Sequence, residues 1–529
     1  MTTPAVMVLG TSSHVGKSLL TTALCRIFAQ RGYRVAPFKS QNMSLNSAAT
    51  VEGLEIGRAQ ALQAEAAGIP PSVHMNPILM KPTGDATSQI VVLGKILGRL
   101  SAAEYHQCRV EELMPIVQES YELLSAKNDV IVLEGAGSPA EINLKEHDIV
   151  NMRMAKLANA HCLLVGDIDR GGVFASLLGT FELLDPDERA RIRGFVINKF
   201  RGDLALLLPG VHQIEQRLGK PCLGVVPYIE GLLLEEEDSV GLSTKVRADW
   251  SNDDSHSRKL RVGVVSFPSL ANFTDFDPLL AEPSVSLRFC RTTKELLGAD
   301  VVILPGSKQT VDDLHWLRER GIGNFLHSHA ATGLTVGICG GMQMLGKEIV
   351  DPAGIETNGA SAAGLGLLAI RTEMQPEKIT VSVTGELLQS RLFGQEVSIE
   401  RLQGYEIHIG QTTYLPGAAP FARFTRTSQS DMTTTDGCVS DDRRTWGTYL
   451  HGIFAGDRFR HEFIRAARAF HHLAPPCDLF RWKEQREIQL DDLARVVSSA
   501  LDLATIFGWL GLPLQAQESS RSATSEVRG

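Results

Sequence analysis

Short apolar runs alternate with amphipathic stretches from residue 4 to about 230, a pattern typical of βαβ units around a parallel sheet. The stretch 19–30 predicts a helix, because its apolar side chains recur on one face and Gly32 offers a C-terminal stop. This block therefore predicts an α/β domain over residues 1–235. Its strands are predicted at 5–9, 34–38, 129–133, 162–165, 194–198 and 222–226.

The pattern breaks at residues 236–258, which are polar, charged and aperiodic, and we interpret them as a linker. A second α/β pattern follows and predicts a domain over 259–475, with strands at 260–266, 300–304 and 334–338. Residues 476–514 predict a helical appendage, helical over 479–511, and the low-complexity segment 515–529 predicts a disordered tail.

Composition narrows the function classes. Of the 529 residues, 43% are hydrophobic and 21% charged, which is ordinary globular composition, and the length exceeds one hydrophobic core. The net charge of −9 argues against a nucleic-acid partner. No apolar run of 18 residues occurs and a phosphate-loop motif begins by Gly10, so we expect no membrane span, no signal peptide and a cytoplasmic location.

The run Gly337-Ile338-Cys339-Gly340-Gly341 joins a predicted strand to a helix predicted over 341–349. Its G-x-C-x-G spacing is the cysteine form of the nucleophile elbow, in which small residues allow a sharp turn that exposes the nucleophile. A lone cysteine is more often inert packing, but packing alone does not need glycines at such a corner. His451, after the predicted strand 446–450, is the candidate base that would activate the thiol of Cys339.

A second motif, Gly10-Thr11-Ser12-Ser13-His14-Val15-Gly16-Lys17-Ser18, lies between the first predicted strand and helix. This is the context of a phosphate-binding loop, although five residues rather than four separate the two glycines. Backbone N–H groups would hold the phosphates of ATP, Lys17 would neutralise them, and Ser18 would bind Mg²⁺. The candidate nucleotide-binding residues are therefore Gly10, Thr11, Gly16, Lys17 and Ser18.

Carboxylates at strand ends could complete the metal site. Glu134 ends one predicted strand, and Asp167 and Asp169 end the next. Each alone could be a turn or capping residue, but the carboxyl edge of a parallel sheet is where ligands bind. Glu134 is the strongest candidate and, with Ser18, forms our predicted Mg²⁺ site.

These motifs, with several longer strings, resemble the cobyric acid synthase family over nearly all of residues 4–475. The resemblance implies a P-loop NTPase-like, dethiobiotin-synthetase-like parallel domain and a class I glutaminase-like domain, both doubly wound α/β. It rests on GTSSHVGKS (10–18), PFKSQNMSLNS (37–47), LEGAGSPAEINL (133–144), GDIDRGGVFAS (166–176), INKFRGD (197–203), LPGSKQT (304–310), GICGGMQMLG (337–346), GYEIHIG (404–410) and GTYLHGIF (447–454).

The resemblance also implies an activity: the family amidates the b, d, e and g carboxylates of adenosylcobyrinic acid a,c-diamide, using ATP, Mg²⁺ and L-glutamine, in cobalamin biosynthesis. By position, Lys39 resembles a phosphate-neutralising lysine, Asn198 an adenine-reading residue, and Asp148 a residue that handles the substrate carboxylate. Backbone N–H groups of Gly306 and Gly340 would form the oxyanion hole, with Gln343 beside them as a glutamine-binding residue.

One departure concerns the catalytic histidine. Related glutaminases carry H-x-E, in which the glutamate orients the ring, but Gly452 and Ile453 follow His451 here. The sequence therefore predicts a Cys339–His451 pair and does not identify the group that orients the ring of His451. It makes no prediction of the oligomeric state.

Two alternatives remain open at this point. Cobyrinate a,c-diamide synthase shares the two-domain plan, although the segment QNMSLNS and the length favour cobyric acid synthase. A ParA- or MinD-like P-loop switch with an inert glutaminase domain is more remote, because such switches place a second lysine where this chain has Ser12.

Overall fold

The computed structural model describes residues 3–83, 87–105, 110–232, 234, 250, 258–357, 359–426, 433–476 and 480–515. Most of the predicted linker 236–258 and nearly all of the predicted tail 515–529 lie outside these residues. Trp250, inside the linker range, is buried, and the guanidinium of Arg288 lies 3.5 Å from the centre of its ring. At that residue the linker range already packs on the second domain.

The first domain is built on a parallel six-stranded sheet in the order β12-β11-β10-β1-β9-β2. All six predicted strands form, and buried apolar side chains of β1 and β10 occupy the centre of the sheet. The strands are β1 (Ala5–Gly10), β2 (Val35–Phe38), β9 (Val130–Glu134), β10 (His161–Asp167), β11 (Ile192–Phe200) and β12 (Cys222–Pro227).

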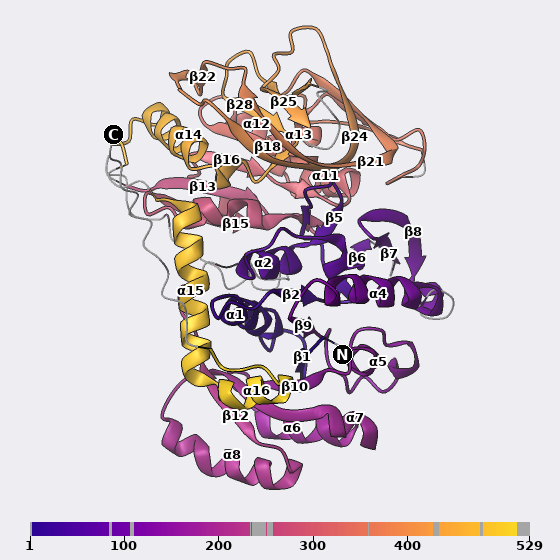
Figure 1. The fold of residues 1–529 in the computed structure, drawn as a ribbon. Coiled ribbons are helices and arrows are strands. Elements are labelled where there is room, and N and C mark those ends of the chain that lie inside the picture. The colour runs from indigo at the N-terminus through magenta and orange to yellow at the C-terminus, as the bar shows by residue number, and fades with distance from the viewer. Residues whose placement is uncertain are drawn as a thin grey trace, which may run out of the picture.

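A smaller β-layer, which the sequence analysis missed, is inserted between β2 and β9. It consists of a four-stranded sheet, β3-β6-β7-β8, and a hairpin, β4-β5. In Figure 1 these elements lie between the first domain and the orange second domain. Their bounds are β3 (Gln41–Met43), β4 (Ser47–Ala49), β5 (Glu55–Gly57), β6 (Ile78–Thr83), β7 (Thr87–Val92) and β8 (Lys95–Ser101).

The helices of the first domain cover both faces of its sheet. The predicted helix 19–30 is confirmed as α1, and its apolar face packs on the central strands. The helices are α1 (Lys17–Ala29), α2 (Arg58–Ala66), α3 (Ala102–Glu104), α4 (Val110–Ser125), α5 (Met152–Leu157), α6 (Val173–Glu182), α7 (Pro186–Arg191) and α8 (Leu204–Leu218).

The second domain has a six-stranded sheet in the order β15-β13-β16-β18-β28-β27, parallel except for the edge strand β27. The predicted strands 260–266, 300–304 and 334–338 are confirmed within one residue at each end. The sheet strands are β13 (Leu260–Val265), β15 (Val285–Cys290), β16 (Val301–Leu304), β18 (Leu334–Ile338), β27 (Cys438–Val439) and β28 (Thr445–Thr448).

A second, mainly antiparallel sheet, which the sequence analysis also missed, brings the long strands β21 (Ile370–Leu387) and β24 (Leu402–Tyr414) to one side of the nucleophile elbow. The short strand β29 (Leu450–His451) pairs with β24. The remaining strands here are β14 (Leu270–Ala271), β17 (Gly306–Ser307), β19 (Glu348–Val350), β20 (Ser361–Ala363), β22 (Arg391–Leu392), β23 (Gln395–Glu396), β25 (Ala422–Arg426) and β26 (Thr433–Asp436).

The helix predicted over 341–349 is shorter than expected. It is α13 (Gly340–Leu345), which ends where Gly346 turns extended and β19 begins, so the prediction for Ile349 was wrong. The other helices of this domain are α9 (Asp277–Leu280), α10 (Thr293–Leu296), α11 (Thr310–Glu319), α12 (Ile322–His329) and α14 (Asp457–Phe470).

The C-terminal helices α15 (Trp482–Ala500) and α16 (Leu503–Leu510) confirm the helical prediction for 479–511. Their apolar side chains pack on the first domain, although the N–H of Trp482 donates to Asp457 of the second. Figure 1 shows α15, in yellow, running from the second domain along the side of the first. Arg26 of α1 pairs with Asp491 at 2.8 Å, and Phe28 packs on Phe507 with ring centres 4.8 Å apart.

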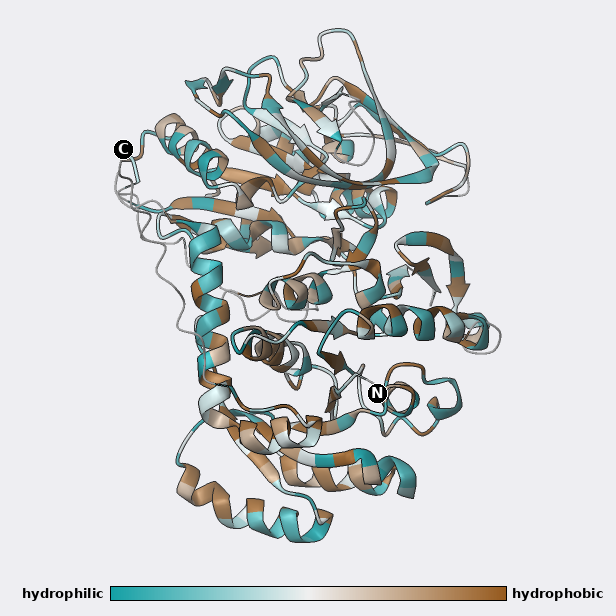
Figure 2. Ribbon diagram, in the orientation of Figure 1, coloured by the Kyte–Doolittle hydropathy of each residue, from teal (hydrophilic) through white to brown (hydrophobic). Residues whose placement is uncertain are grey.

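Hydropathy follows this arrangement. In Figure 2 brown, hydrophobic residues run along the strands inside the first domain, whereas α15 alternates teal and brown along its length. Within the described ranges, no helix is both long enough and apolar enough to cross a bilayer.

Candidate active sites on either side of the domain interface

The loop between β1 and α1 has the backbone that phosphate binding requires. Gly16 has φ +98°, and a Cβ there would lie 2.2 Å from Nδ2 of Asn198, so the position needs glycine. Nδ2 of Asn198 donates to the carbonyl of Val15 at 2.7 Å and ties β11 to the loop. A Cβ on Gly10 would lie 2.6 Å from Val15. Both glycines of the motif are thus required by close packing.

The side chains at the end of this loop form a buried polar cluster around Glu134. Ser18 donates to its carboxylate at 2.8 Å, Lys39 pairs with it at 3.0 Å, and Nε2 of Gln63 donates to it at 2.5 Å. Nζ of Lys17 donates to the carbonyls of Ser12 and Gly137, each at 2.9 Å. Ser18 and Lys39 therefore meet Glu134 at the sheet edge, and Lys17 is held by the loop itself and by the segment after β9.

This donor set fits Mg²⁺. The ion prefers oxygen ligands and is commonly held by one or two carboxylates together with substrate phosphates, and Ser18 and Glu134 offer a hydroxyl and a carboxylate already in contact. Within the described ranges no group of three or more His, Cys, Asp or Glu side chains could hold a metal by itself. The site therefore suits an ion that arrives with a nucleotide.

The other strand-end acids have structural partners. Asp167 pairs with Lys199 at 2.9 Å and accepts the N–H of Asp169 at the same distance. Asp169 in turn pairs with Arg201 at 3.3 Å. The structure therefore favours the turn interpretation for Asp167 and Asp169. Thr11 donates its backbone N–H to the carbonyl of Val165 at 2.9 Å and fixes the start of the loop.

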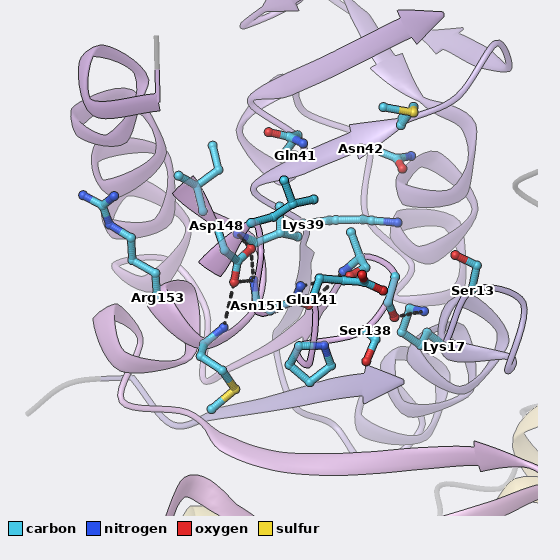
Figure 3. A pocket seen from close by; sticks show the side chains of 18 of the residues that line it. Ser13, Lys17, Lys39, Gln41, Asn42, Ser138, Glu141, Asp148, Asn151 and Arg153 are labelled. Atoms are coloured by element: carbon cyan, nitrogen blue, oxygen red, sulfur yellow. Dashed lines mark hydrogen bonds between the residues drawn. The ribbon is translucent and has the colours of Figure 1, made fainter. Parts of the chain in front are cut away.

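A cavity of about 760 Å³ opens in front of this cluster. Figure 3 shows Lys17 and Lys39 on one side of it and Asp148 and Arg153 on the other. The carboxylate of Asp148 accepts three backbone N–H groups, from Val150, Asn151 and Met152, at 2.9–3.2 Å, where α5 begins. Asp148 thus lines the cavity, but its carboxylate is engaged by the backbone of the turn that leads into α5.

The nucleophile elbow is formed between β18 and α13. Cys339 has φ 51° and ψ −112°, a strained conformation for a residue with a side chain. Its N–H donates to the carbonyl of Thr448 at 2.8 Å, and its Sγ lies 3.5 Å from the carbonyl oxygen of Ile407. A Cβ on Gly341 would lie 1.9 Å from the carbonyl oxygen of Leu304. The glycine after Gly340 is therefore needed for the turn.

The orienting acid that the sequence analysis did not find is Asp275. Its Oδ2 lies 2.6 Å from Nδ1 of His451, and its Oδ1 accepts the N–H of Gly452 at 3.0 Å. Both side chains are buried. In the sequence, Asp275 could have been noticed as an acid next to the aromatic residues of ANFTDFDPL (271–279). Asp277 lies in the same run, so the sequence alone did not single out Asp275.

The environment of His451 favours the imidazolium. Burial lowers the pKa of His451, but the Asp275 carboxylate and then Cys339 outweigh burial and raise this pKa to about 10. Cys339 and His451 line the same cavity. Nε2 of His451 is buried and has no hydrogen-bond partner among the described residues. The ring of Tyr405 stacks on His451, with centres 5.4 Å apart.

A second cavity, of about 50 Å³, brings the predicted glutaminase residues together: Cys339, His451, Gly306 and Gln343 line it. Gly340 lies just outside this lining, but a Cβ there would be 2.9 Å from the backbone N of Ser307, so the two backbone segments are adjacent. Nε2 of Gln343 donates to the hydroxyl of Tyr449 at 3.0 Å.

Comparison with known proteins identifies both domains. Residues 6–240 match the CobQ/CobB/MinD/ParA nucleotide binding domain, and residues 261–459 match the CobB/CobQ-like glutamine amidotransferase domain. The chain is 48% identical to the cobyric acid synthase of Desulforudis audaxviator, over 97% of this chain and 100% of that protein. It is 47% identical to the cobyric acid synthase of Moorella thermoacetica, over 96% and 97%.

The chain belongs to the cobyric acid synthase family. Members of this family are amidoligases that join a nucleotide-binding domain to a glutamine amidotransferase domain. Among solved structures, PurLQS from Thermotoga maritima is similar to 41% of the chain at 16% identity, with a TM-score of 0.30, which is too low to support any argument.

In this member of the family, strand β4 of the synthase domain contacts the glutaminase site. The backbone N–H of Ser47 donates to Oδ1 of Asn272 at 3.0 Å, and its carbonyl accepts the hydroxyl of Tyr405 at 3.3 Å. Asn272 is three residues before Asp275, and the ring of Tyr405 stacks on His451. Ser47 therefore connects the first domain to both segments that hold the imidazole of His451.

A buried ionic cluster lies beside this contact. Glu55 pairs with Lys81 of its own domain at 2.5 Å and with Lys378 of the glutaminase domain. Burial alone would raise the pKa of Glu55, but Lys378 and Lys81 hold it well below its ordinary value. Because Lys81 also lines the cavity of Cys339, the synthase domain contributes directly to the wall of the glutaminase site.

Proposed function

We propose that this chain converts adenosylcobyrinic acid a,c-diamide to adenosylcobyric acid by amidating its b, d, e and g carboxylates, with ATP, Mg²⁺ and L-glutamine. The observation that carries the proposal is the pairing, in one chain of this family, of a buried Cys339–His451–Asp275 arrangement with a phosphate loop beside a cavity of about 760 Å³. We expect the cytoplasm as its location.

In the glutaminase site, the thiolate of Cys339 would attack the side-chain amide carbon of glutamine and form a tetrahedral oxyanion. Backbone N–H groups of Gly306 and Gly340 would stabilise that oxyanion. The imidazolium of His451 would give its proton to the departing nitrogen, so that ammonia leaves and a γ-glutamyl thioester remains. Water, deprotonated by the same ring, would release glutamate, while Asp275 holds the ring in place.

In the synthase site, the predicted roles follow from the contacts around Glu134. ATP would supply a phosphoryl group that converts a substrate carboxylate to an acyl phosphate, and bound Mg²⁺ would supply charge neutralisation. Lys17 and Lys39 would hold the negative phosphates, and Ser18 and Glu134 would hold the ion. Ammonia would then displace phosphate from the acyl group to give the amide. Asn198 remains our candidate for adenine recognition.

The wall between the two cavities supports a short path for ammonia. Leu270 and Phe273 line the large cavity, whereas Ala271 and Asn272, between them, line the small one. In the same way, Lys81 lines the small cavity and Pro82 the large one. Two short backbone segments thus border both sites, so ammonia released at Cys339 would have little protein to cross before it meets the acyl phosphate.

The test is mass spectrometry of adenosylcobyrinic acid a,c-diamide after incubation with enzyme, ATP, Mg²⁺ and either glutamine or ammonium. We expect four successive carboxylate-to-amide exchanges, and we expect Cys339→Ala to form amides with ammonium only. No change in substrate mass would refute the proposal. Amidation of cobyrinic acid at two positions instead would identify a cobyrinate a,c-diamide synthase, and ATP hydrolysis without amidation would favour the switch alternative.

A further inference from the structure

His408 is a buried polar residue in the glutaminase site that the mechanism above does not use. It lies on β24, is 7% exposed, and lines the same small cavity as Cys339 and His451. The residue before it, Ile407, provides the carbonyl oxygen 3.5 Å from Sγ of Cys339. His408 is therefore next to the sulfur that would attack the substrate.

The two ring nitrogens of His408 are in different situations. Nδ1 lies 2.8 Å from the carbonyl oxygen of Gly410, which can only accept, so Nδ1 carries the proton. Nε2 is buried and has no hydrogen-bond partner among the described residues. Burial lowers the pKa of His408 to about 3, so Nε2 presents a lone pair at neutral pH. Leaving a buried acceptor without a donor is costly.

The ring is also held rigidly. It stacks on Tyr449 with centres 3.7 Å apart and an interplanar angle of 12°. Tyr449 itself accepts a hydrogen bond from Gln343, another residue that lines the cavity. His408 thus offers a fixed acceptor in a site where a substrate amide must be oriented before attack.

We propose that Nε2 of His408 accepts a hydrogen bond from the γ-carboxamide N–H of bound glutamine and so selects glutamine over glutamate. This inference rests on the proposed glutaminase function. The γ-carboxylate of glutamate has no N–H to donate, and its oxygen lone pairs would face the lone pair of Nε2. The same contact would let the product glutamate leave after hydrolysis. His408 is in this view a specificity-determining residue, whereas the covalent chemistry stays with Cys339 and His451.

Two variants test the contact. An asparagine at 408 can still donate to Gly410, as Nδ1 does, but does not reach the position of Nε2, whereas a glutamine side chain can place an oxygen near that position. We expect His408→Asn to raise KM for glutamine roughly tenfold or more, the effect of one lost hydrogen bond, with a smaller change in kcat. The inhibition constant of glutamate should change little, and His408→Gln should restore part of the discrimination.

Glutaramate, which is glutamine without its α-amino group, identifies the donor. If the γ-amide donates, His408→Asn lowers kcat/KM for glutaramate and for glutamine by the same factor. A loss confined to glutamine would show that the α-ammonium is the donor and would overturn the proposal. An unchanged ratio of glutamine KM to glutamate inhibition constant in both variants would overturn it as well.

Amidation with ammonium serves as the control for folding, since it bypasses the small cavity. If a variant loses this activity too, the other variant decides the outcome. The proposed function fails separately, when wild-type enzyme neither hydrolyses glutamine nor amidates the corrinoid. If wild-type enzyme hydrolyses glutamine and the His408 variants keep the wild-type KM for glutamine, only the proposed role of His408 is contradicted.

Discussion

The two cavities of this molecule differ by more than tenfold in volume, and the difference reflects two kinds of recognition. The glutaminase cavity, about 50 Å³, is small and is lined by buried polar groups whose positions are fixed by Asp275, Tyr405 and Tyr449. The synthase cavity, about 760 Å³, is lined by side chains from several separate loops. A small amide attacked by one thiol suits the first, and a large substrate with four carboxylates suits the second.

This comparison also indicates how binding differs. In the proposed reaction, four carboxylates would react in turn at one phosphate site, so the substrate would have to be released or turned between steps. A glutamine that reacts once can be held tightly. We therefore expect substitutions in the small cavity to act on one reaction, and substitutions at the phosphate loop to act on all four amidations.

The largest effect is expected for Lys17→Ala. Loss of the charge that holds the phosphates should lower amide formation by about 10²–10³-fold, whether glutamine or ammonium supplies the nitrogen. Glutamate release without the corrinoid should persist, because Cys339 lies across the interface. Both products are measured in one assay, with Lys127→Ala, an exposed lysine after α4, as the matched control. If amidation with ammonium survives in Lys17→Ala, the assignment of the phosphate site is wrong.

The next effect is expected for Asp275→Asn. Without the carboxylate that holds His451, glutamine hydrolysis should fall by about 10²–10⁴-fold, as when the acid of a catalytic triad is neutralised. Amidation with ammonium should remain near the wild-type rate. A variant that hydrolyses glutamine normally would show that Asp275 has no part in orienting the imidazole.

The contact between His451 and Asp275 also makes the stability of the folded protein depend on pH. The pKa of His451 is raised from 6.5 to about 10, so the folded state holds this proton more tightly than the unfolded chain. The resulting stabilisation is complete below about pH 6.5 and is lost as the pH rises through about 10. The gap in unfolding free energy between wild type and Asp275→Asn, measured with urea, should therefore narrow over this range. A constant gap would contradict this account.

The smallest effect, but the one most specific to the interface, is expected for Asn272→Gly. Glycine tolerates the left-handed backbone at this position, φ +53°, and the substitution removes the cavity-lining side chain whose Oδ1 accepts the N–H of Ser47. Glutamine hydrolysis should then respond less to a filled synthase site, and the ratio of glutamate to amide formed should rise about three- to tenfold, the effect of one hydrogen bond.

Tyr405→Phe is a second test of the contact with Ser47. It removes the hydroxyl that donates to Ser47 and keeps the ring that stacks on His451. If both variants keep the wild-type ratio of glutamate to amide, contacts of Ser47 do not connect the two sites.

Local sequence patterns predicted the phosphate loop, the nucleophile elbow and most strands of the two parallel sheets. Each of these depends on a short run of residues: glycine at Gly16 and Gly341 because a Cβ would collide with neighbouring atoms, and apolar periodicity because buried strands require it. The inserted sheet β3-β6-β7-β8 and the long strands β21 and β24 were missed. The pattern of exposed and buried positions in these strands does not indicate which strand each will pair with, because the partner strand lies elsewhere in the chain.

Only the tertiary structure shows the contacts between segments that lie far apart in the chain. Asp275 meets His451 across 176 positions, and α15 completes the domain at the opposite end of the sequence through Arg26 and Asp491. The spacing of residues in the sequence does not indicate such contacts, because they form only when distant segments pack together in the folded chain. The sequence by itself predicted Cys339, His451 and the phosphate loop as the groups that carry the chemistry. The tertiary structure placed Asp275 beside His451 and brought Ser47 of the first domain against the segments that hold this imidazole.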